Sequence, residues 1–430
     1  ISLPVPREPL VRPRMVAVQL FPTRAARGLA GLAVLLGANV LGACSPTPAA
    51  AEPDEESTSG GLPVARSEWR MYRGDAAQTG VAAGSLGAEF EVLWSFEAGG
   101  AVTSSPVVAN GLVYFGSDDY ELHAVDLETG EQRWAFATED LIEAPPMVHD
   151  ETVYVGSNDF RLYAVNAATG ELRWRAETDD KILGGAVAVP SADGSGTWIV
   201  VGSYDNSLYA FDSVSGERIW RYETQNFVNG TPAVLDGKVV FGGCDSALHV
   251  VSTDTGEALN MVPLGQGCNV AGSVALAGGQ VFFGHYGNEF VCMDIETGET
   301  VWSYPDPRYP FFSAPAIGED VVIFGGRDKQ LHCVSRATGE PIWKFKTGRK
   351  IDGSPVICGD KVVFGSGDGW LYVLSLGEGT ELWSYEIGRS IFTSPAVVDG
   401  VILIGANDSR LYAFGPVTET ETGANREEDR

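Results

Sequence analysis

The chain has 430 residues, of which 57 are acidic and 29 basic, giving a formal net charge of −28. Surfaces that bind nucleic acid or anionic lipid headgroups need clustered Lys and Arg, so this balance argues against DNA, RNA and membrane phosphates as partners. The 53 glycines, with no long run of helix formers beyond the N-terminal region, favour an all-β fold of short strands and tight turns.

Residues 1–44 are predicted to be an upstream extension followed by a lipoprotein signal peptide. Met15 is the expected start, and residues 28–41 form an apolar stretch too short to span a bilayer comfortably. The stretch leads into Leu-Gly-Ala-Cys, which resembles a bacterial lipobox and makes Cys44 the expected site of lipidation. A plain secretory signal is the alternative.

Two further segments are predicted to lack a packed core. Residues 45–66 are rich in Pro, Ala, Ser and acidic residues, and 416–430 form an acidic tail. We therefore expect a disordered linker, a folded domain over 67–415 and a disordered tail.

A repeat dominates the folded part. Tryptophans recur at intervals of 40 to 46 residues, with one interval of 82 that hides a unit carrying Asn260 at the tryptophan position. Each unit contains four apolar stretches separated by turn residues, as 104–134 does. Four short strands per unit predict an eight-bladed β-propeller with four-stranded antiparallel blades. The recurring residues are Trp94, Trp134, Trp174, Trp220, Trp302, Trp343 and Trp383.

The ends of the repeat predict how the ring closes. The last unit stops at Gly415 after three strands, whereas an orphan strand, 92–96, precedes the first unit. We expect this N-terminal strand to complete the last blade and so remove an open edge. Each tryptophan follows a turn glycine by four residues, which places it on a fourth strand as a structural docking residue between blades.

Two motifs resemble those of a known family. Residues 124–134 (AVDLETGEQRW), 164–174 and 210–220 are similar to the tryptophan-docking motif of propellers related to pyrroloquinoline quinone (PQQ) proteins. Ahead of them, 69–80 (WRMYRGDAAQTG) resembles the leader of that family's non-dehydrogenase members. The resemblance covers about 67–415 and implies the same eight-bladed fold.

The resemblance implies two alternative functions. PQQ-dependent alcohol dehydrogenases carry a vicinal Cys-Cys disulfide, a calcium ion and long loops around the quinone, whereas BamB and its relatives assist insertion of β-barrel proteins without catalysis. This chain has no Cys-Cys pair and short connections. The resemblance therefore favours a non-catalytic scaffold without a cofactor, with a PQQ-dependent oxidoreductase holding PQQ and calcium, or a small-ligand or polysaccharide-binding propeller, as alternatives.

The same branch implies a location and partners. We expect an outer-membrane lipoprotein of the bacterial envelope that faces the periplasm, touches the membrane only through its lipid anchor and is monomeric by itself. Its expected partners are envelope proteins, a β-barrel assembly complex among them.

One acidic position recurs just after the glycine that ends each second strand. A ring of carboxylates suggests calcium, but an Asp at a tight turn bonds its own backbone, and recurrence in seven of eight units favours the turn interpretation. The histidines at the third-strand position occupied elsewhere by tyrosine are expected to be packing variants. The acidic residues are Asp119, Asp159, Asp205, Asp245, Asp328, Asp368 and Asp408.

The cysteines of the repeat fall into two groups. Cys292 and Cys333 occupy equivalent points of neighbouring units and are expected to be buried thiols. Cys244 follows a second strand and Cys268 precedes a first strand, and both kinds of loop open on one face of a propeller. A Cys244–Cys268 disulfide is therefore a hypothesis, and two free thiols are the alternative.

Residues that precede the first strands are the candidates for binding, because they line the mouth of the central channel. One sector of this rim is acidic, and the other is basic and aromatic, which suits an extended peptide or a partner's loop. An ordinary solvated rim is the alternative. The candidate residues are Glu143, Phe312, Arg349, Lys350, Asp352, Arg389 and Phe392.

Overall fold

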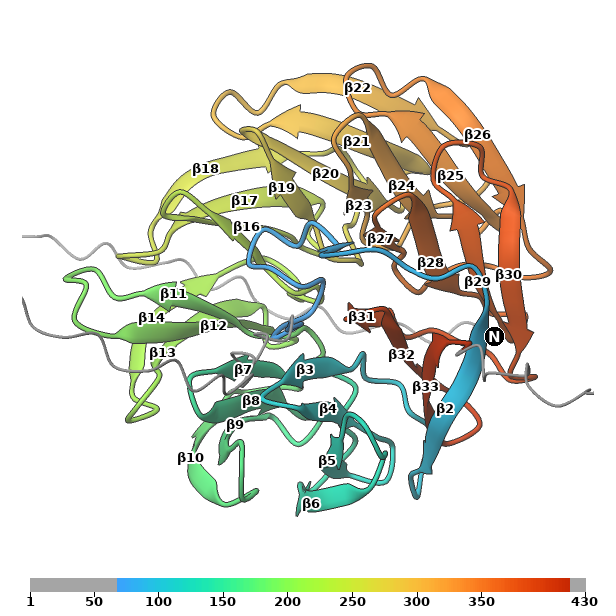
Figure 1. Ribbon diagram of the computed structural model, residues 1–430. Coiled ribbons are helices and arrows are strands. Elements are labelled where there is room, and N and C mark those ends of the chain that lie inside the picture. Colours follow the sequence, from blue (N-terminus) through green and yellow to red (C-terminus); the bar gives the residue numbers. More distant parts are fainter. Residues whose placement is uncertain (1–67, 418–430) are drawn as a thin grey trace, which may run out of the picture. The chain divides into compact units, whose positions relative to one another are not determined.

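The computed structural model describes residues 68–417, which fold into eight antiparallel four-stranded units (Figure 1). The predicted eight-bladed β-propeller is confirmed. The predicted signal peptide with Cys44, the linker to residue 66 and nearly all of the tail lie outside the described residues. Within 68–417 there is no helix with the length and apolar character needed to cross a membrane.

Each blade runs from an innermost to an outermost strand. Blade 1 contains β3 (Val107–Ala109), β4 (Leu112–Gly116), β5 (Glu121–Asp126) and β6 (Gln132–Ala137). The inner strand β3 is buried along its whole length, whereas the edge strand β6 is mostly exposed apart from Trp134. The continuous apolar runs in the sequence are therefore inner and middle strands, and the polar runs with one tryptophan are edges.

The other blades repeat this order. Blade 2 contains β7 (Met147–His149), β8 (Thr152–Gly156), β9 (Arg161–Asn166) and β10 (Leu172–Glu177); blade 3 contains β11 (Val187–Pro190), β12 (Thr197–Ser203), β13 (Ser207–Asp212) and β14 (Arg218–Glu223). Blade 4 contains β15 (Ala233–Leu235), β16 (Lys238–Gly242), β17 (Ala247–Ser252) and β18 (Ala258–Pro263); blade 5 contains β19 (Ala275–Ala277), β20 (Gln280–His285), β21 (Glu289–Asp294) and β22 (Thr300–Pro305). Blade 6 contains β23 (Ala316–Ile317), β24 (Val321–Gly325), β25 (Gln330–Ser335) and β26 (Pro341–Lys346); blade 7 contains β27 (Val356–Cys358), β28 (Lys361–Gly365), β29 (Trp370–Ser375) and β30 (Glu381–Glu386).

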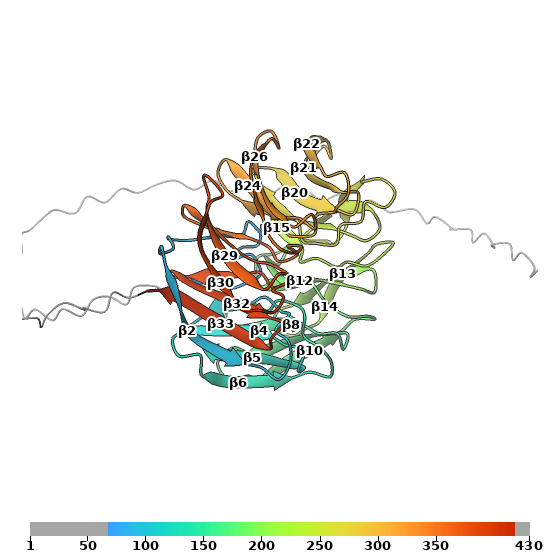
Figure 2. The same ribbon diagram turned by 90° about the vertical axis from the view of Figure 1, so that its right-hand side faces the viewer.

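Blade 8 closes the ring as predicted. It contains β31 (Ala396–Val398), β32 (Val401–Ala406) and β33 (Arg410–Pro416), and its outer strand is the N-terminal β2 (Phe90–Glu97). Strands β2 and β33 are antiparallel, with Trp94 opposite Ala413. The innermost strands β3 and β31 then contact each other, so the ring has no open seam (Figure 1; Figure 2).

Six of the seven recurring tryptophans donate a hydrogen bond to the next blade. The Trp134 indole nitrogen donates to the Ala167 carbonyl oxygen of blade 2 at 3.0 Å. Gly170, at φ 74°, covers the same ring, and a Cβ on it would lie 2.8 Å from the indole. Five other tryptophans donate equivalent bonds to the next blade: Trp94, Trp174, Trp220, Trp302 and Trp343.

A segment ahead of β2 crosses the inside of the ring. We call residues 69–82 the strap; they are the blue trace at the centre of Figure 1. Trp69 pairs with the middle of β3, and the strap then accepts hydrogen bonds from the inner strands of further blades, such as Val148 N–H to the Arg70 oxygen and Ile317 N–H to the Thr79 oxygen. It ends as β1 (Val81–Ala82), which pairs in parallel with β27. The strap therefore ties together the inner strands of both halves of the ring.

Candidate functional site

One face of the propeller carries all the predicted rim residues. We call it the upper face: the loops that lead into each innermost strand and the turns between second and third strands both open there. The opposite lower face carries the turns between first and second and between third and fourth strands.

A central pit opens on the upper face, with a volume of about 160 Å³. The strap closes its floor, where the Tyr72 hydroxyl lies 3.0 Å from Ser354 Oγ and 3.3 Å from Ser394 Oγ. The wall is built mainly from small and hydroxyl-bearing residues that precede the inner strands, including Ser105, Thr231 and Ser273. The channel is therefore a blind, polar pit rather than a pore.

Three predicted rim residues meet at the mouth of this pit: Phe312, Asp352 and Phe392. Arg327 donates to both oxygens of Asp352, at 3.0 and 3.2 Å, and Lys350 Nζ lies 2.5 Å from the second of them. The Arg327 guanidinium is 4.0 Å from the Phe312 ring centre, and Lys350 Nζ is 5.1 Å from that of Phe392.

These contacts join aromatic rings and charged side chains in one continuous row. We call Tyr286, Phe312, Arg327, Asp352, Lys350 and Phe392 the ion–aromatic row; the Tyr286 and Phe312 ring centres are 4.4 Å apart. Cation–π contacts and paired charges hold the side chains in place. The row presents rigid aromatic surface in an otherwise acidic protein.

The remaining rim residues lie apart from the pit. Arg349 and Arg389 are exposed and line a separate hollow of about 350 Å³ together with Asp368. Glu143 accepts a hydrogen bond from Asn158 Nδ2 at 2.8 Å and does not line the pit. The structure thus gathers Phe312, Asp352 and Phe392 at the pit and places Arg349, Arg389 and Glu143 outside its lining.

Sequence reasoning missed Arg327 and Tyr286, which lie in turns between second and third strands. Both occupy the repeat position directly before the recurrent Asp, or before the Gly that replaces it in blade 5. The same position holds Asp118, whose pKa is raised by burial and by the neighbouring Glu143 charge. Aligning the eight repeats at this position would have added a second ring of residues to the predicted rim.

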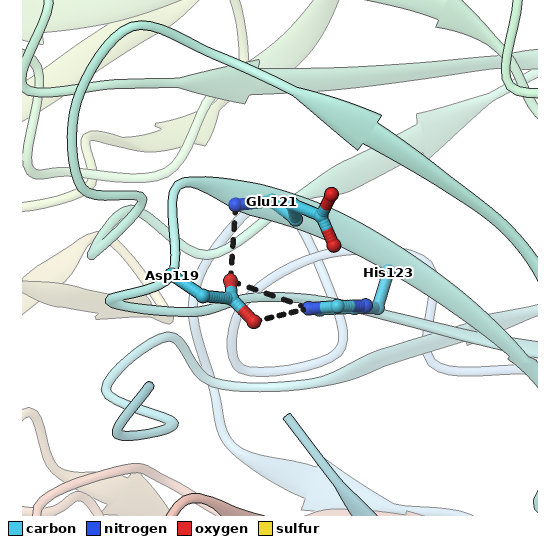
Figure 3. Close-up of side chains that lie close together, drawn as sticks. All are labelled: Asp119, Glu121 and His123. Carbon is cyan, nitrogen blue, oxygen red and sulfur yellow. Dashed lines mark hydrogen bonds and ion pairs between the residues drawn. The ribbon is translucent and has the colours of Figure 1, made fainter. Parts of the chain in front are cut away.

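The recurrent Asp residues form turns, which supports the turn interpretation over a metal site. Asp119 accepts bonds from Glu121 N–H at 3.0 Å and His123 Nε2 at 3.1 Å (Figure 3), and from Gly99 N–H at 2.7 Å. The possible ligand atoms of Asp119, Glu121 and His123 lie within 4.8 Å of one another. The Asp119 carboxylate, however, already accepts hydrogen bonds from two backbone N–H groups and one imidazole ring.

Two histidines form buried Asp–His–Tyr chains. His249 contacts Asp245 and Tyr222, and His332 contacts Asp328 and Tyr304, with both imidazoles about 1% exposed. Burial opposes ionisation of Asp245, but the hydrogen bond and charge of His249 outweigh it and hold the pKa of that carboxyl below its usual range. These chains pack between blades and line neither the pit nor the hollow beside Arg349, so we assign them a structural role.

The cysteines of the described part are free thiols. Cys292 and Cys333 are fully buried, as expected, and burial raises the pKa of each to about 12. The loops that carry Cys244 and Cys268 are neighbours, since Ser246 Oγ donates to Asn269 Oδ1 at 2.6 Å. Both thiols are unpaired, and the Cys244–Cys268 disulfide stays a prediction.

The pit does not suit PQQ with calcium. Asp352 is the acidic residue that lines it, and this carboxylate is already paired with Arg327 and Lys350. A calcium ion needs several free oxygen ligands, and the strap leaves little room beneath the mouth.

Sequence comparison connects the chain with two families. Residues 142–383 match the family described as the beta-propeller of the beta-alanine-activating enzyme, and residues 87–194 match the one described as outer membrane protein assembly factor BamB. A comparison with curated proteins gives no match.

Solved structures share the fold. BamB from Moraxella catarrhalis is 20% identical with a TM-score of 0.64, over 79% of this chain and 100% of that one. The quinohemoprotein alcohol dehydrogenase from Comamonas testosteroni is 15% identical with a TM-score of 0.70, over 84% and 83%. The computationally designed Ika8 protein is 18% identical with a TM-score of 0.65, over 76% and 99%. Since BamB, an alcohol dehydrogenase and a designed protein all match, these likenesses show the fold and not the function.

Proposed function

We propose that the chain, which belongs to the family described as the beta-propeller of the beta-alanine-activating enzyme, is a non-catalytic scaffold that binds other proteins. The match to that family covers more than half of the chain's residues. The proposal rests on the ion–aromatic row at the mouth of the pit. Clustered aromatic and arginine side chains dominate the binding energy of protein interfaces.

The charges of the row favour an acidic or acid-terminated partner segment. In a chain of net charge −28, Arg327, Lys350, Arg349 and Arg389 gather in one sector of the upper face. Such local complementarity steers association and fixes orientation. The aromatic rings beside these cations supply the apolar contact area.

The setting we propose is the bacterial envelope, in assembly of outer-membrane β-barrel proteins. The match of residues 87–194 to the BamB family supports this role, as does the lipobox-like sequence that ends at Cys44. We propose attachment to the outer membrane through a lipid on Cys44, with the propeller in the periplasm and a β-barrel assembly complex as partner.

Site-specific photocrosslinking tests both parts of the proposal. A benzoylphenylalanine at Phe312 of the full-length chain should crosslink to a subunit of the β-barrel assembly complex in envelopes of the source bacterium. The matched control is Val214, which is 85% exposed in a turn on the lower face.

The pattern of crosslinks decides between outcomes. A crosslink at Phe312 that is absent at Val214 and lost in Arg327→Ala supports the proposed surface. A specific crosslink to another envelope protein keeps the scaffold and rejects the assembly role. Equal crosslinking at both positions, or none at Phe312, contradicts the binding surface.

A further inference from the structure

The wall of the pit holds hydroxyl groups that have a hydrogen left to donate. Gly185 N–H donates to Thr231 Oγ1 at 2.8 Å, and Thr231 N–H donates to Ser273 Oγ at 2.9 Å. Ser105 Oγ likewise accepts the Ser394 N–H at 2.9 Å. Each oxygen accepts from the preceding blade, so each hydroxyl hydrogen must be donated elsewhere. Within residues 68–417 these three hydroxyls have no acceptor of their own, and all three line the pit.

A buried cation lies beside the floor of the pit. Arg73 follows Tyr72 in the strap and is 1% exposed. Its guanidinium donates to the carbonyl oxygens of Pro355 and Pro315, at 2.5 and 2.7 Å, and its Nε has no partner in the described part of the chain. These acceptors are neutral, and burial lowers the pKa of Arg73 to about 10. The nearby Asp75 carboxylate partly offsets this effect of burial, and Arg73 itself does not line the pit.

The size and shape of the pit suit the end of a chain. The pit is small, with a volume of about 160 Å³. Because Tyr72 closes the floor, a chain that continued through the pit would have to turn back within this volume, whereas a chain end fits directly. Phe312 and Phe392 at the mouth then contact the apolar side chain next to that end.

The chemistry of the wall distinguishes between the two ends of a peptide. An ammonium group needs acceptors, and Asp352 is already paired with Arg327 and Lys350. A carboxylate needs donors, which Ser105, Thr231 and Ser273 supply. Charge-assisted bonds from hydroxyl groups to a carboxylate are stronger than bonds between neutral groups.

We propose that the pit binds a carboxylate through the hydroxyls of Ser105, Thr231 and Ser273, as the C-terminus of an extended peptide. The proposal deepens the scaffold function and rests on it, since it states which part of a partner the upper face recognises. A small free carboxylic acid offers the same chemistry and is the other source that the test separates.

The test compares two synthetic peptides, acetyl-Gly-Ser-Gly-Ser-Phe with a free C-terminal acid and the same peptide as its amide, with sodium acetate as a third probe. Binding to the purified full-length chain is measured by isothermal titration calorimetry. We expect the acid to bind about tenfold more tightly than the amide, as one charged hydrogen bond is worth about that factor. Acetate that binds as tightly as the acid peptide identifies a small free acid as the source.

Neighbouring serines provide a matched pair of variants. Ser105→Ala should weaken binding of the acid peptide by about tenfold and leave the amide unchanged. Ser104→Ala should change neither, because the Ser104 hydroxyl already donates to the Ala144 carbonyl at 2.8 Å. Ser273→Ala provides an independent variant in another blade, and circular dichroism confirms that each variant is folded.

Two results would overturn the carboxylate proposal. Equal affinity for acid and amide, with both lost in Phe312→Ala, rejects the carboxylate and retains the protein-binding surface. If neither the acid peptide nor acetate binds, the carboxylate proposal is wrong, and photocrosslinking from Phe312 separately decides whether the scaffold proposal stands.

Discussion

Single residues decide how well each blade contacts the next. The Tyr222 hydroxyl lies 3.0 Å from His249 Nδ1, and the Tyr304 hydroxyl lies 3.1 Å from His332 Nδ1. His123 of blade 1 has Phe96 of blade 8 in the corresponding place, with ring centres 5.3 Å apart, and its Nδ1 has no partner in the described structure. A buried polar atom without a partner lowers stability.

Phe96→Tyr should therefore stabilise the propeller by about 1 kcal/mol, because the new hydroxyl can bond His123 Nδ1. Urea unfolding followed by tryptophan fluorescence measures the change. Phe136→Tyr is the control, since Phe136 faces Tyr163 at 5.4 Å and offers no imidazole nitrogen. A gain in Phe96→Tyr no larger than in the control would show that the imidazole nitrogen is not the cause.

Blade 4 lacks its docking tryptophan. Gly298 of blade 5 keeps the positive φ of 70°, but a Cβ on it would lie 2.7 Å from Val262 and 3.6 Å from Asn260. Asn260→Trp should raise the melting temperature, by roughly 2–4 °C for each kcal/mol gained, through burial of the indole under Gly298. Trp302→Asn should lower it. No change or a fall in Asn260→Trp would mean that Val262 and its neighbours have been rebuilt around Asn260.

At this scale the sequence was informative where a residue recurs. The docking role of Trp134 and the turn role of Asp119 follow from their repeat positions, and the structure supports both. Recurrence would have placed Arg327 on the rim but not its contacts with Asp352 and Phe312, because these two residues come from other loops. The Cys244–Cys268 pair stays a prediction for the same reason, since spacing gives no distance between two loops.

Among the elements, the strap is the one that sequence periodicity did not place. The blades have a repeated pattern of apolar stretches, whereas residues 69–82 have none, and their hydrogen bonds go to the inner strands of distant parts of the chain. The resemblance of 69–80 to a family leader identified the segment but not its path. The blind pit therefore could not be predicted, although three residues at its mouth were.

The strap depends on Gly80. Gly80 has a φ of 67°, and a Cβ on it would lie 1.9 Å from Arg73 Nη2. Arg73 is buried and bonded to two carbonyls, so it cannot move aside. Gly80→Ala should therefore destabilise the protein by roughly 3 kcal/mol or more in urea unfolding, from backbone strain and overpacking together.

Gly84→Ala is the matched control for Gly80. Gly84 also has a positive φ, of 85°, but a Cβ on it would have no neighbour within 4 Å. For Gly84→Ala we therefore expect a loss of only about 1–2 kcal/mol in the free energy of unfolding, from placing a residue with a Cβ at positive φ. Equal losses in the two variants would show that contact with Arg73 contributes nothing to the stability of the strap.

The whole molecule combines a closed ring with a net charge of −28. The number of blades and closure by the N-terminal strand were both predictable. The repeat begins with an unpaired strand and ends with a blade that lacks one, so pairing the two completes the ring. The basic sector with Arg349, Lys350 and Arg389 was expected from the sequence, but Arg327 was not, because it comes from a turn between second and third strands.

Self-repulsion at this charge should make stability depend on salt. The Debye length falls from about 30 Å at 0.01 M to about 8 Å at 0.15 M salt, so screening favours the compact state. We expect the melting temperature to rise between these concentrations of sodium chloride at pH 7, as measured by calorimetry. Choline chloride should give the same rise. An effect of one salt alone would indicate binding of a specific ion.

The pairing of β2 with β33 also constrains how the protein is made. Ser95 lies opposite Tyr412 in this pair, so the ribosome completes β2 long before its partner exists. Pairings between residues so far apart in the chain form slowly, and unpaired edges expose apolar side chains in the meantime. Leu93 of β2 is 46% exposed even in the folded ring, and it is one of the apolar side chains left without a partner strand until β33 has been made. A chain that terminates early cannot form blade 8, and ring closure thus acts as a check that synthesis has reached the last strand.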